Sequence, residues 1–212
     1  AARQNPAWWP RADAPAGVPS SAIVFGGRCG TVAPLVYQAR SWKHGVLVGA
    51  GVASETTAAA VGKVGVVRRD SMAMKPFAGY NFGDYFAHWL NVGATLKSPP
   101  QIFHVNWFRR DAAGKFLWPG YGENLRVLSW IIDRCKGKVP ARETPIGLLP
   151  SPADLNTRSL ELAPGALDEL LTVDRELWIE EMKSVGEYLR QFGSRLPNAL
   201  LEEQAATLAR LS

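Results

Sequence analysis

The segment from Trp107 to Asn124 holds the side chains best suited to bind a small anionic, aromatic molecule. Five aromatic residues are interleaved there with three cations, namely Trp107, Phe108, Phe116, Trp118 and Tyr121 with Arg109, Arg110 and Lys115. Flat rings can stack on a base while neighbouring cations neutralise its phosphates. The pattern leaves a second interpretation open, a β-hairpin that turns at Asp-Ala-Ala-Gly and buries its aromatic side chains.

The glycine-flanked loop Gly120-Tyr121-Gly122-Glu123-Asn124 favours the binding interpretation. It opens a predicted helix, so its backbone N–H groups are available to a ligand. The Asn124 amide offers a donor and an acceptor for the hydrogen-bonding edge of a purine. A second candidate is Gly26-Gly27-Arg28, which follows a short strand. Its glycines allow a phosphate close to the backbone, and a guanidinium can bind phosphate oxygens in pairs.

One apparent phosphate-binding motif does not fit its consensus pattern. Gly62-Lys63 resembles the end of a Walker phosphate-binding loop. Thr57 stands where the first glycine belongs, and Val64 stands where a magnesium-binding Ser or Thr should be. The match is therefore rejected.

The cysteines and histidines do not suggest a metal site. Cys29 and Cys135 are far apart and lack the spacing of a zinc site or a disulfide framework. His44, His88 and His104 have no metal-type spacing either. We expect the histidines to be structural, and we assign no metal ligand in this chain.

Short strands and helices alternate along the first 150 residues and would position these loops. The apolar patterns predict strands at Ser21 to Phe25, His44 to Val52, Gln101 to Asn106 and Pro145 to Leu149, and helices at Gly83 to Leu96 and Glu123 to Cys135. From Ala53 to Val66 the residues are small and without periodicity, which fits either a mobile loop or an Ala-rich helix capped by Ser54. The alternation predicts a mixed α/β fold in layers.

Residues 151–212 are predicted to be helical. Asp174 can cap a helix whose apolar residues recur at spacings of three and four, and Asn198 can cap a final helix to Leu211. Pro164 to Leu171 adds a shorter helical segment. We expect the apolar stripe of these helices to be core rather than a site.

Composition describes a globular protein with an uneven charge. The 212 residues are 47% hydrophobic and 20% charged, and no run of 18 apolar residues suggests a membrane span. Up to Pro140 there are 17 Lys and Arg against 7 Asp and Glu, whereas the remainder has 7 against 12. A basic body suits an anionic ligand, which leaves nucleic acid, nucleotide and acidic metabolite open.

Several strings together resemble a known family. In order they are SAIVFGGR, SWKHGVLVGA, MAMKPFAGYNFGDYFAHWL, IFHVNWFRRDAAGKFLWPGYGEN and TPIG. They are similar to the C-terminal third of GTP-dependent phosphoenolpyruvate carboxykinase, from about Asn5 to Leu149 and more loosely beyond. The resemblance implies a mixed-sheet nucleotide-binding lobe over residues 1–150, followed by a helical C-terminal subdomain over residues 151–212.

The resemblance also implies a function. Members of this family convert oxaloacetate and GTP to phosphoenolpyruvate, GDP and CO2 in gluconeogenesis, with Mn2+ and Mg2+. The expected partners are these small molecules and the guanine nucleotide, without nucleic acid or membrane, in a cytoplasmic enzyme that is monomeric when intact. The family's metal ligands, phosphate loop, reactive cysteine and carboxylate-binding arginines lie upstream of the region that matches Ala1. Because phosphoryl transfer depends on clamping of the phosphates, we expect these 212 residues alone to be inactive.

The resemblance assigns roles to individual residues. Arg28 matches an arginine that contacts nucleotide phosphates, and Asn124, with the backbone of Tyr121, Gly122 and Glu123, matches the loop that reads guanine. The aromatic residues that match those enclosing guanine are Trp107, Phe108, Phe116 and Tyr121. The segment that resembles a mobile lid lies near 56–66 and includes Thr56, Thr57, Ala58, Ala59, Ala60, Val61, Gly62 and Lys63.

Four positions depart from the family pattern. Cys29 stands where a second arginine is usual, and Gly30 stands where proline is frequent, which predicts a looser loop after Arg28. Ala53 replaces an arginine found in many members, and Tyr121 replaces a phenylalanine while keeping the ring.

The alternative to the enzyme is a non-catalytic module that binds RNA or a regulatory nucleotide with the same aromatic and basic surface. The coding sequence upstream of Ala1 distinguishes the two, because only the enzyme requires the metal and phosphate-loop residues there.

Overall fold

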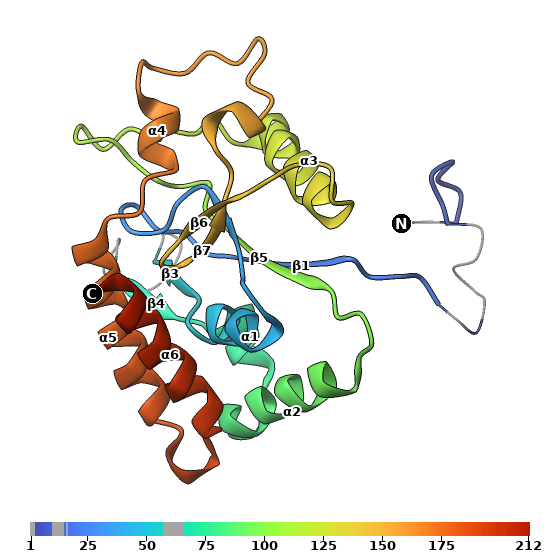
Figure 1. The fold of residues 1–212 in the computed structure, drawn as a ribbon, viewed down its shortest axis with the longest axis vertical. Coiled ribbons are helices and arrows are strands. Elements are labelled where there is room, and N and C mark those ends of the chain that lie inside the picture. Colours follow the sequence, from blue (N-terminus) through green and yellow to red (C-terminus); the bar gives the residue numbers. More distant parts are fainter. Residues whose placement is uncertain (1–2, 10–14, 16, 57–65) are drawn as a thin grey trace.

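A mixed β-sheet forms the centre of the computed structural model, which describes residues 3–9, 15, 17–56 and 66–212 (Figure 1). Among these residues the sheet has five strands in the order β1-β5-β2-β7-β6. The strands are β1 (Ala22–Gly26), β5 (Gln101–Val105), β2 (Val36–Gln38), β7 (Gly147–Leu149) and β6 (Arg142–Thr144). β1 and β5 are parallel, and each later neighbour in this order is antiparallel. The predicted mixed α/β fold is confirmed.

A second, two-stranded antiparallel sheet and the helices surround this centre (Figure 1). The small sheet consists of β3 (Ala53–Glu55) and β4 (Val67–Arg69). The α-helices are α1 (Trp42–Ala50), α2 (Phe82–Thr95), α3 (Asn124–Cys135), α4 (Ala166–Leu170), α5 (Arg175–Arg190) and α6 (Asn198–Leu211). Short 3-10 turns occupy Ser71–Ala73, Lys75–Phe77, Tyr121–Glu123, Pro152–Asp154 and Gly193–Arg195.

The sheet separates two clusters of buried apolar side chains. Successive residues of a strand point to opposite faces, and in β5 Ile102 joins one cluster while Phe103 joins the other. The Ile102 cluster packs α1, α2, α5 and α6 against one face, and the Phe103 cluster packs α3 and α4 against the other. Figure 1 shows α5 and α6 side by side, with α1 next to α6.

The predicted strand from His44 to Val52 is wrong, because this segment is helix α1. Short apolar runs without clear periodicity do not distinguish a buried strand from a buried helix. Ser41 was the available signal, since its side chain accepts the His44 N–H at 3.1 Å and caps the helix. Gly45 and Gly49 allow the helix to lie directly on the sheet. A Cβ at Gly45 would come within 2.3 Å of Ile102, and one at Gly49 within 2.6 Å of Phe25.

The other predicted elements of the first 150 residues have their predicted type. The strands near Ser21, Gln101 and Pro145 and the helices near Gly83 and Glu123 correspond to β1, β5, β7, α2 and α3. The predicted helix cap at Ser54, with Glu55 in the first turn, is wrong, because Ser54 and Glu55 belong to strand β3. The Ala-rich stretch itself, from Thr57 to Gly65, lies outside the described residues.

The helical character of the C-terminal part is confirmed. Asp174 caps α5 by accepting the Leu177 N–H at 3.0 Å. The predicted cap at Asn198 is wrong, because Asn198 is already helical and Pro197 holds the cap position without a side-chain bond. The domain boundary near residue 150 stays a prediction. No helix in the described ranges is long and apolar enough to cross a membrane.

Two of the three histidines are buried. In α1, the His44 Nδ1 accepts the Arg40 N–H at 3.1 Å, and burial lowers the pKa of His44 from 6.5 to about 4 despite the opposing charge of Glu203. His104 in β5 is buried, and the loss of hydration lowers its pKa to about 4 as well. His88 is exposed on α2. Both buried rings are therefore neutral at pH 7.

We expect the protein to lose stability as the pH falls from 6.5 towards 4. In this window the unfolded chain binds protons at His44 and His104 that the folded chain excludes, so the free energy of unfolding rises with pH. Each shift corresponds to about 3 kcal/mol when fully expressed. Urea unfolding at pH 7.0 and 4.5 measures the difference. His44→Gln keeps an acceptor for Arg40 and should reduce this difference between the two pH values, whereas His88→Gln should leave it unchanged. Equal differences in both variants would contradict the assignment.

Candidate functional site

The loop after β1 is held against strand β3 by backbone and side-chain hydrogen bonds. The Arg28 N–H donates to Ser54 Oγ at 3.2 Å, and the Gly30 N–H donates to Glu55 Oε1 at 2.6 Å. In return the Glu55 N–H donates to the Arg28 carbonyl at 2.9 Å. These contacts tie down the loop that the departures at positions 29 and 30 predict to be looser.

Asn106, the residue after β5, fastens the other side of the same loop. It is completely buried, and its Nδ2 donates to the carbonyls of Cys29 and Ala33, each at 2.8 Å. Its Oδ1 accepts the N–H groups of Cys29 at 3.3 Å and Phe108 at 3.2 Å. No role was predicted for Asn106 from the sequence. The available signal was a polar residue directly after a buried strand, where a carboxamide can satisfy backbone groups.

The glycines of this loop serve close packing of the backbone. A Cβ at Gly27 would lie 2.0 Å from the Ala53 carbonyl oxygen, so only glycine fits there. A Cβ at Gly26 would lie 3.1 Å from the Val105 side chain. The glycine pair therefore allows the small sheet to approach the carboxyl end of β1.

Arg28 and two of the predicted aromatic residues lie together. The guanidinium carbon of Arg28 lies 4.1 Å from the centre of the Phe108 ring and 5.9 Å from that of Phe116. The two rings meet edge to face, with centres 5.9 Å apart. Beside them is a surface pocket of about 380 Å³, lined by Gly26, Gly27, Arg28, Ser54, Val105, Trp107 and Phe108. Trp107 thus joins the same site.

The aromatic rings are carried by a hairpin, as the second interpretation predicted. Arg110 and Phe116 form an antiparallel bridge, and the Asp111 side chain accepts the N–H groups of Ala113 and Lys115 in the turn, both at 2.9 Å. Trp118 is buried in the core, whereas Phe116 is 45% exposed. The hairpin therefore places Trp118 in the core and Phe108 beside the pocket. That these rings bind a base stays a prediction.

The cations of the hairpin have different surroundings. Arg110 lies 5.1 Å from the Phe116 ring centre and 3.8 Å from the Glu55 carboxylate. Arg109 points away into the protein, where it donates to the Thr172 carbonyl at 3.0 Å. Burial lowers the pKa of Arg109. Arg109 is therefore a structural residue, and Arg28 is the cation closest to the site's rings.

The loop from Gly120 to Asn124 has a constrained backbone and one fixed side chain. Gly120 has φ of 79° and Tyr121 has φ of 48°, both in the left-handed region that favours glycine. Tyr121 is 94% exposed. The Asn124 Oδ1 accepts the Trp118 Nε1–H at 2.9 Å, so the buried indole orients this carboxamide. Glu123 forms an ion pair with Arg126.

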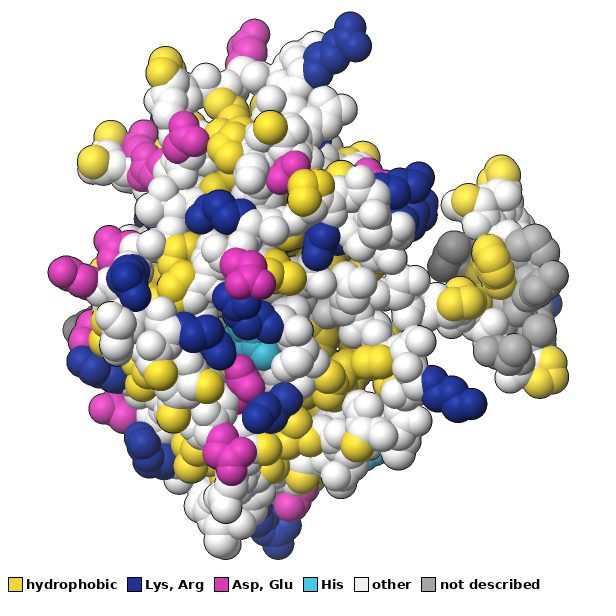
Figure 2. All heavy atoms as spheres, viewed as in Figure 1, with side chains coloured by type: hydrophobic (Ala, Val, Ile, Leu, Met, Phe, Trp, Pro, Cys, Tyr) yellow, Lys and Arg dark blue, Asp and Glu magenta, His cyan; other side chains and the backbone are white. Residues whose placement is uncertain are grey.

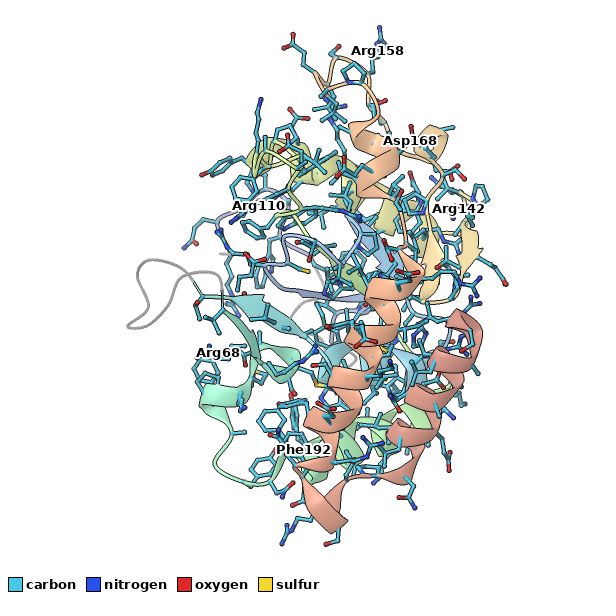
Figure 3. All side chains as sticks on the ribbon, turned by 90° about the vertical axis from the view of Figure 1, so that its left-hand side faces the viewer. Arg68, Arg110, Arg142, Arg158, Asp168 and Phe192 are labelled. Atoms are coloured by element: carbon cyan, nitrogen blue, oxygen red, sulfur yellow. The ribbon has the colours of Figure 1, made fainter. Side chains whose placement is uncertain are left out.

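The predicted lid lies almost entirely outside the described residues, because Thr57 to Gly65 are not among them. Its two ends are described. The Thr56 N–H donates to the Val66 carbonyl at 2.9 Å, so the segment is the connection between β3 and β4 in this hairpin. In Figure 3, Arg110 and Arg68 lie on the same side of the molecule as this hairpin.

The hairpin is anchored to helix α5 by Arg69, which lies directly opposite Ala53 in the ladder. Its guanidinium donates to Glu181 at 2.5 and 3.0 Å, to the Gly51 carbonyl at 2.9 Å and to Ser184 Oγ at 2.9 Å. Arg69 therefore places a cation on β4 directly opposite Ala53, the position where many family members have an arginine.

The basic residues do not form a separate patch on the face of the molecule that Figure 2 draws. On the face drawn in Figure 2, Lys and Arg side chains are interspersed with Asp and Glu. Among the described residues no group of three or more His, Cys, Asp or Glu side chains could hold a metal ion.

These features define the class of the protein. β1 and β5 are parallel, and the loops at their carboxyl ends bring Arg28, Asn106 and Phe108 together. The crevice at the carboxyl ends of parallel strands is where open α/β sheets bind ligands. The chain is an α/β domain with a basic and aromatic pocket at that place.

Comparison with known proteins identifies the family. Residues 1–210 match the family described as phosphoenolpyruvate carboxykinase C-terminal P-loop domain, and the chain belongs to it. It is 49% identical over 210 residues to the phosphoenolpyruvate carboxykinase [GTP] of Anaeromyxobacter sp. (strain K), covering 99% of this chain and 35% of that protein. The corresponding protein of Neocallimastix frontalis is 52% identical over 198 residues, covering 92% and 32%. The chain spans about a third of the length of these curated relatives.

We expect replacement of Asn106 to damage the site and the fold together. Asn106→Leu leaves the carbonyls and N–H groups of the loop without their buried partner, which should reduce the free energy of unfolding by roughly 3 kcal/mol. Urea unfolding measures this. The control is Asn91→Leu on the exposed surface of α2, which should change stability by less than about 0.5 kcal/mol. Similar small losses in both variants would show that Asn106 does not hold the loop.

Proposed function

We propose that this chain is the guanine-nucleotide-binding part of a GTP-dependent phosphoenolpyruvate carboxykinase. The observation that carries the proposal is the Arg28 guanidinium over the Phe108 ring at the edge of the pocket. A cation beside exposed aromatic faces suits a ligand that combines phosphate with a base. The match to carboxykinases over 99% of the chain supports this interpretation rather than a separate RNA-binding module.

In the proposal, Arg28 binds the phosphates, and Trp107, Phe108, Phe116 and Tyr121 surround the base. The Arg28 side chain is placed for this because the backbone around it is hydrogen-bonded to β3 and to Asn106. An ordered backbone lets the guanidinium form paired contacts with less loss of entropy on binding.

The bond between Trp118 and Asn124 supports a preference for guanine. Because the Asn124 oxygen accepts the indole N–H, the carboxamide is held in one orientation, and its NH2 group, which only donates, can face a ligand. Guanine presents an oxygen acceptor, O6, where adenine presents an amino donor. A fixed donor therefore favours guanine. The backbone N–H groups of Tyr121 and Gly122 complete the proposed reading loop, because the Glu123 N–H already donates to the Gly120 carbonyl at 3.1 Å.

The whole enzyme would convert oxaloacetate and GTP to phosphoenolpyruvate, GDP and CO2, as a cytoplasmic monomer. Its Mn2+ and Mg2+ have no set of ligands among the described residues of this chain, and we derive no step through them. We assign this chain the nucleotide pocket and the lid near 56–66, which would exclude water during the reaction. The chemical step would use residues of the remaining two thirds of the protein.

We expect the chain to bind GDP more tightly than ADP, and Trp118→Phe to reduce the preference. Because a fixed donor cannot bond the adenine amino group, the free energy of binding should be less favourable for ADP by roughly 1–3 kcal/mol. Trp118→Phe removes the indole N–H, so Asn124 can turn its oxygen towards adenine. Calorimetric titration of both nucleotides measures the ratio. The control, Trp130→Phe, alters a buried indole in the α3 cluster and should keep it. Equal affinity of the unmodified chain for GDP and ADP would overturn the proposal.

We expect Arg28→Ala to weaken GTP binding without weakening guanosine binding. The guanidinium should contact phosphate, and a charge-assisted hydrogen bond is worth roughly 1.5–3 kcal/mol. Calorimetry with GTP and guanosine separates the two contributions. Arg158→Ala provides the control, because it removes the same charge from an exposed position well separated from Arg110 in Figure 3. An equal loss for both ligands would mean that Arg28 acts through the fold.

A further inference from the structure

The central sheet is open along β1. Among the described residues β1 pairs only with β5, so it forms one edge of the sheet, and β6 forms the other. The β6 edge is three residues long and contains Arg142 and Glu143, whereas β1 has five residues, Ala-Ile-Val-Phe-Gly, without a charge or a proline. Edge strands are usually kept short, charged or interrupted by proline, because an unpaired apolar edge attracts another strand. β6 fits this description and β1 does not.

The backbone of β1 directs hydrogen-bonding groups away from the sheet. The Gln101 N–H donates to the Ser21 carbonyl at 2.9 Å, which shows that Ser21 faces β5. This direction alternates from residue to residue along a strand. Ala22, Val24 and Gly26 therefore direct their N–H and C=O groups to the open side of β1. These groups are available to a further strand.

The sequence of β1 is typical of a strand inside a sheet. Parallel strands that are covered on both faces have continuous apolar runs rather than alternating ones, and β1 is such a run. The described part of the chain leaves it partly uncovered. Val24 is 41% exposed, and an apolar groove of about 490 Å³ lies beside Ala22 and Ile23, with Trp42 and Trp89 in its wall. Figure 2 shows hydrophobic side chains exposed in this region, between β1 and α2.

Helix α3 has an uncovered apolar face as well. The helix packs against β1, and the Sγ of its last residue, Cys135, lies 3.5 Å from the Ser21 carbonyl. Leu125 and Ile132 are 65% and 50% exposed. They are seven residues apart and so lie on one face of the helix. A strand beside β1 that leads into a helix beside α3 thus has apolar surface to bury on both elements.

A phosphate-binding loop has the required form, because it connects a strand to a helix. The family that the chain matches is described as a P-loop domain, and the P-loop pattern ends in Gly-Lys followed by Ser or Thr. No Gly-Lys pair in the 212 residues is followed by Ser or Thr. Since the chain covers 35% of a carboxykinase relative, the strand and its loop would belong to the remaining part of the enzyme.

We propose that the open side of β1 pairs, in parallel, with the strand that carries the phosphate loop in the remaining two thirds of the carboxykinase. The proposal rests on the proposed function, because it takes the chain to be part of that enzyme. Parallel pairing brings the carboxyl ends of the two strands together, where open α/β sheets bind ligands. The phosphate loop then lies beside Gly26, Gly27 and Arg28, and its backbone N–H groups and the Arg28 guanidinium bind the same chain of phosphates.

Hydrogen exchange of the 212-residue chain and of the full-length enzyme tests the pairing. In the chain alone, the Val24 amide on the open side should exchange quickly, whereas the amide of Phe25, which is buried and faces β5, should exchange slowly. In the full-length enzyme exchange at Val24 should be slower by about 100-fold or more, with Phe25 still slow. Mass spectrometry with electron-transfer fragmentation measures the two amides separately.

Two exchange results would overturn the pairing. One is fast exchange at Val24 in the full-length enzyme. The other is slow exchange at Val24 in the chain alone, and a doubled mass in light scattering would then identify a second copy as the occupant. Exchange is measured without nucleotide, and calorimetry measures GTP binding separately. A protected Val24 without GTP binding would contradict the proposed function alone, whereas GTP binding with an unprotected Val24 would contradict the pairing alone.

A charged residue on the open edge gives a second test. Val24→Lys has a matched control in Leu177→Lys on α5, since these side chains are 41% and 42% exposed. In the 212-residue chain each variant should change Tm by less than about 2 °C. In the full-length enzyme Val24→Lys should weaken GTP binding at least about tenfold, and Leu177→Lys should not. A lysine by its charge alone would favour GTP, so a loss of affinity reports the pairing. Equal affinities of the two full-length variants would overturn the proposal.

Cross-linking tests the parallel direction. Cys29 follows the carboxyl end of β1, and Cys135 lies beside its amino end; both thiols are free and partly exposed. A cysteine introduced into the phosphate loop of the full-length enzyme should be linked to Cys29 by a bismaleimide that spans about 10 Å, or two strand spacings. A link to Cys135, or to neither thiol, would overturn the parallel arrangement.

Discussion

The arrangement of the site depends on the four hydrogen bonds of the buried Asn106 side chain. They reach the backbone of Cys29 and Ala33 in one loop and of Phe108 in the other, and so join the ends of two parallel strands. Backbone groups buried at such a place need partners, and no regular ladder can supply them beyond the strand ends. The carboxamide supplies both donors and acceptors from a single position. Arg28 and Phe108 are neighbours because these two loops are fastened there.

Close packing of the backbone allows these hydrogen bonds to hold the two loops together. Gly27 lets β3 approach the loop from one side, and Ser54 and Glu55 then reach its N–H groups. Gly45 and Gly49 let α1 lie directly on β5 and β1. Glycine is needed at these positions because a Cβ would overlap the neighbouring element, and protein interiors cannot absorb such overlaps cheaply. The same glycines that a sequence pattern associates with turns or phosphate contact are here required by packing.

The hairpin between Phe108 and Trp118 links the core to the surface. Trp118 is buried and orients Asn124, while Phe108 and Phe116 stay at the pocket beside Arg28. Burial of one ring thus positions polar and aromatic groups that would otherwise move freely.

The sequence by itself determined the family, the mixed α/β class, most of the helices and strands, and the segments that carry the candidate site. These features depend on local periodicity, on caps such as Asp174 and on strings of specific residues, all of which can be read without coordinates. Only the tertiary structure decided that residues 42–50 form a helix, because an apolar run buried on all sides has no periodicity to distinguish it from a strand. It also decided the roles of Asn106, Arg109 and Glu55, since each acts through a partner distant in the sequence. The packing of the whole chain determines which of several similar cations faces the pocket and which faces the core. The local sequence pattern does not distinguish them.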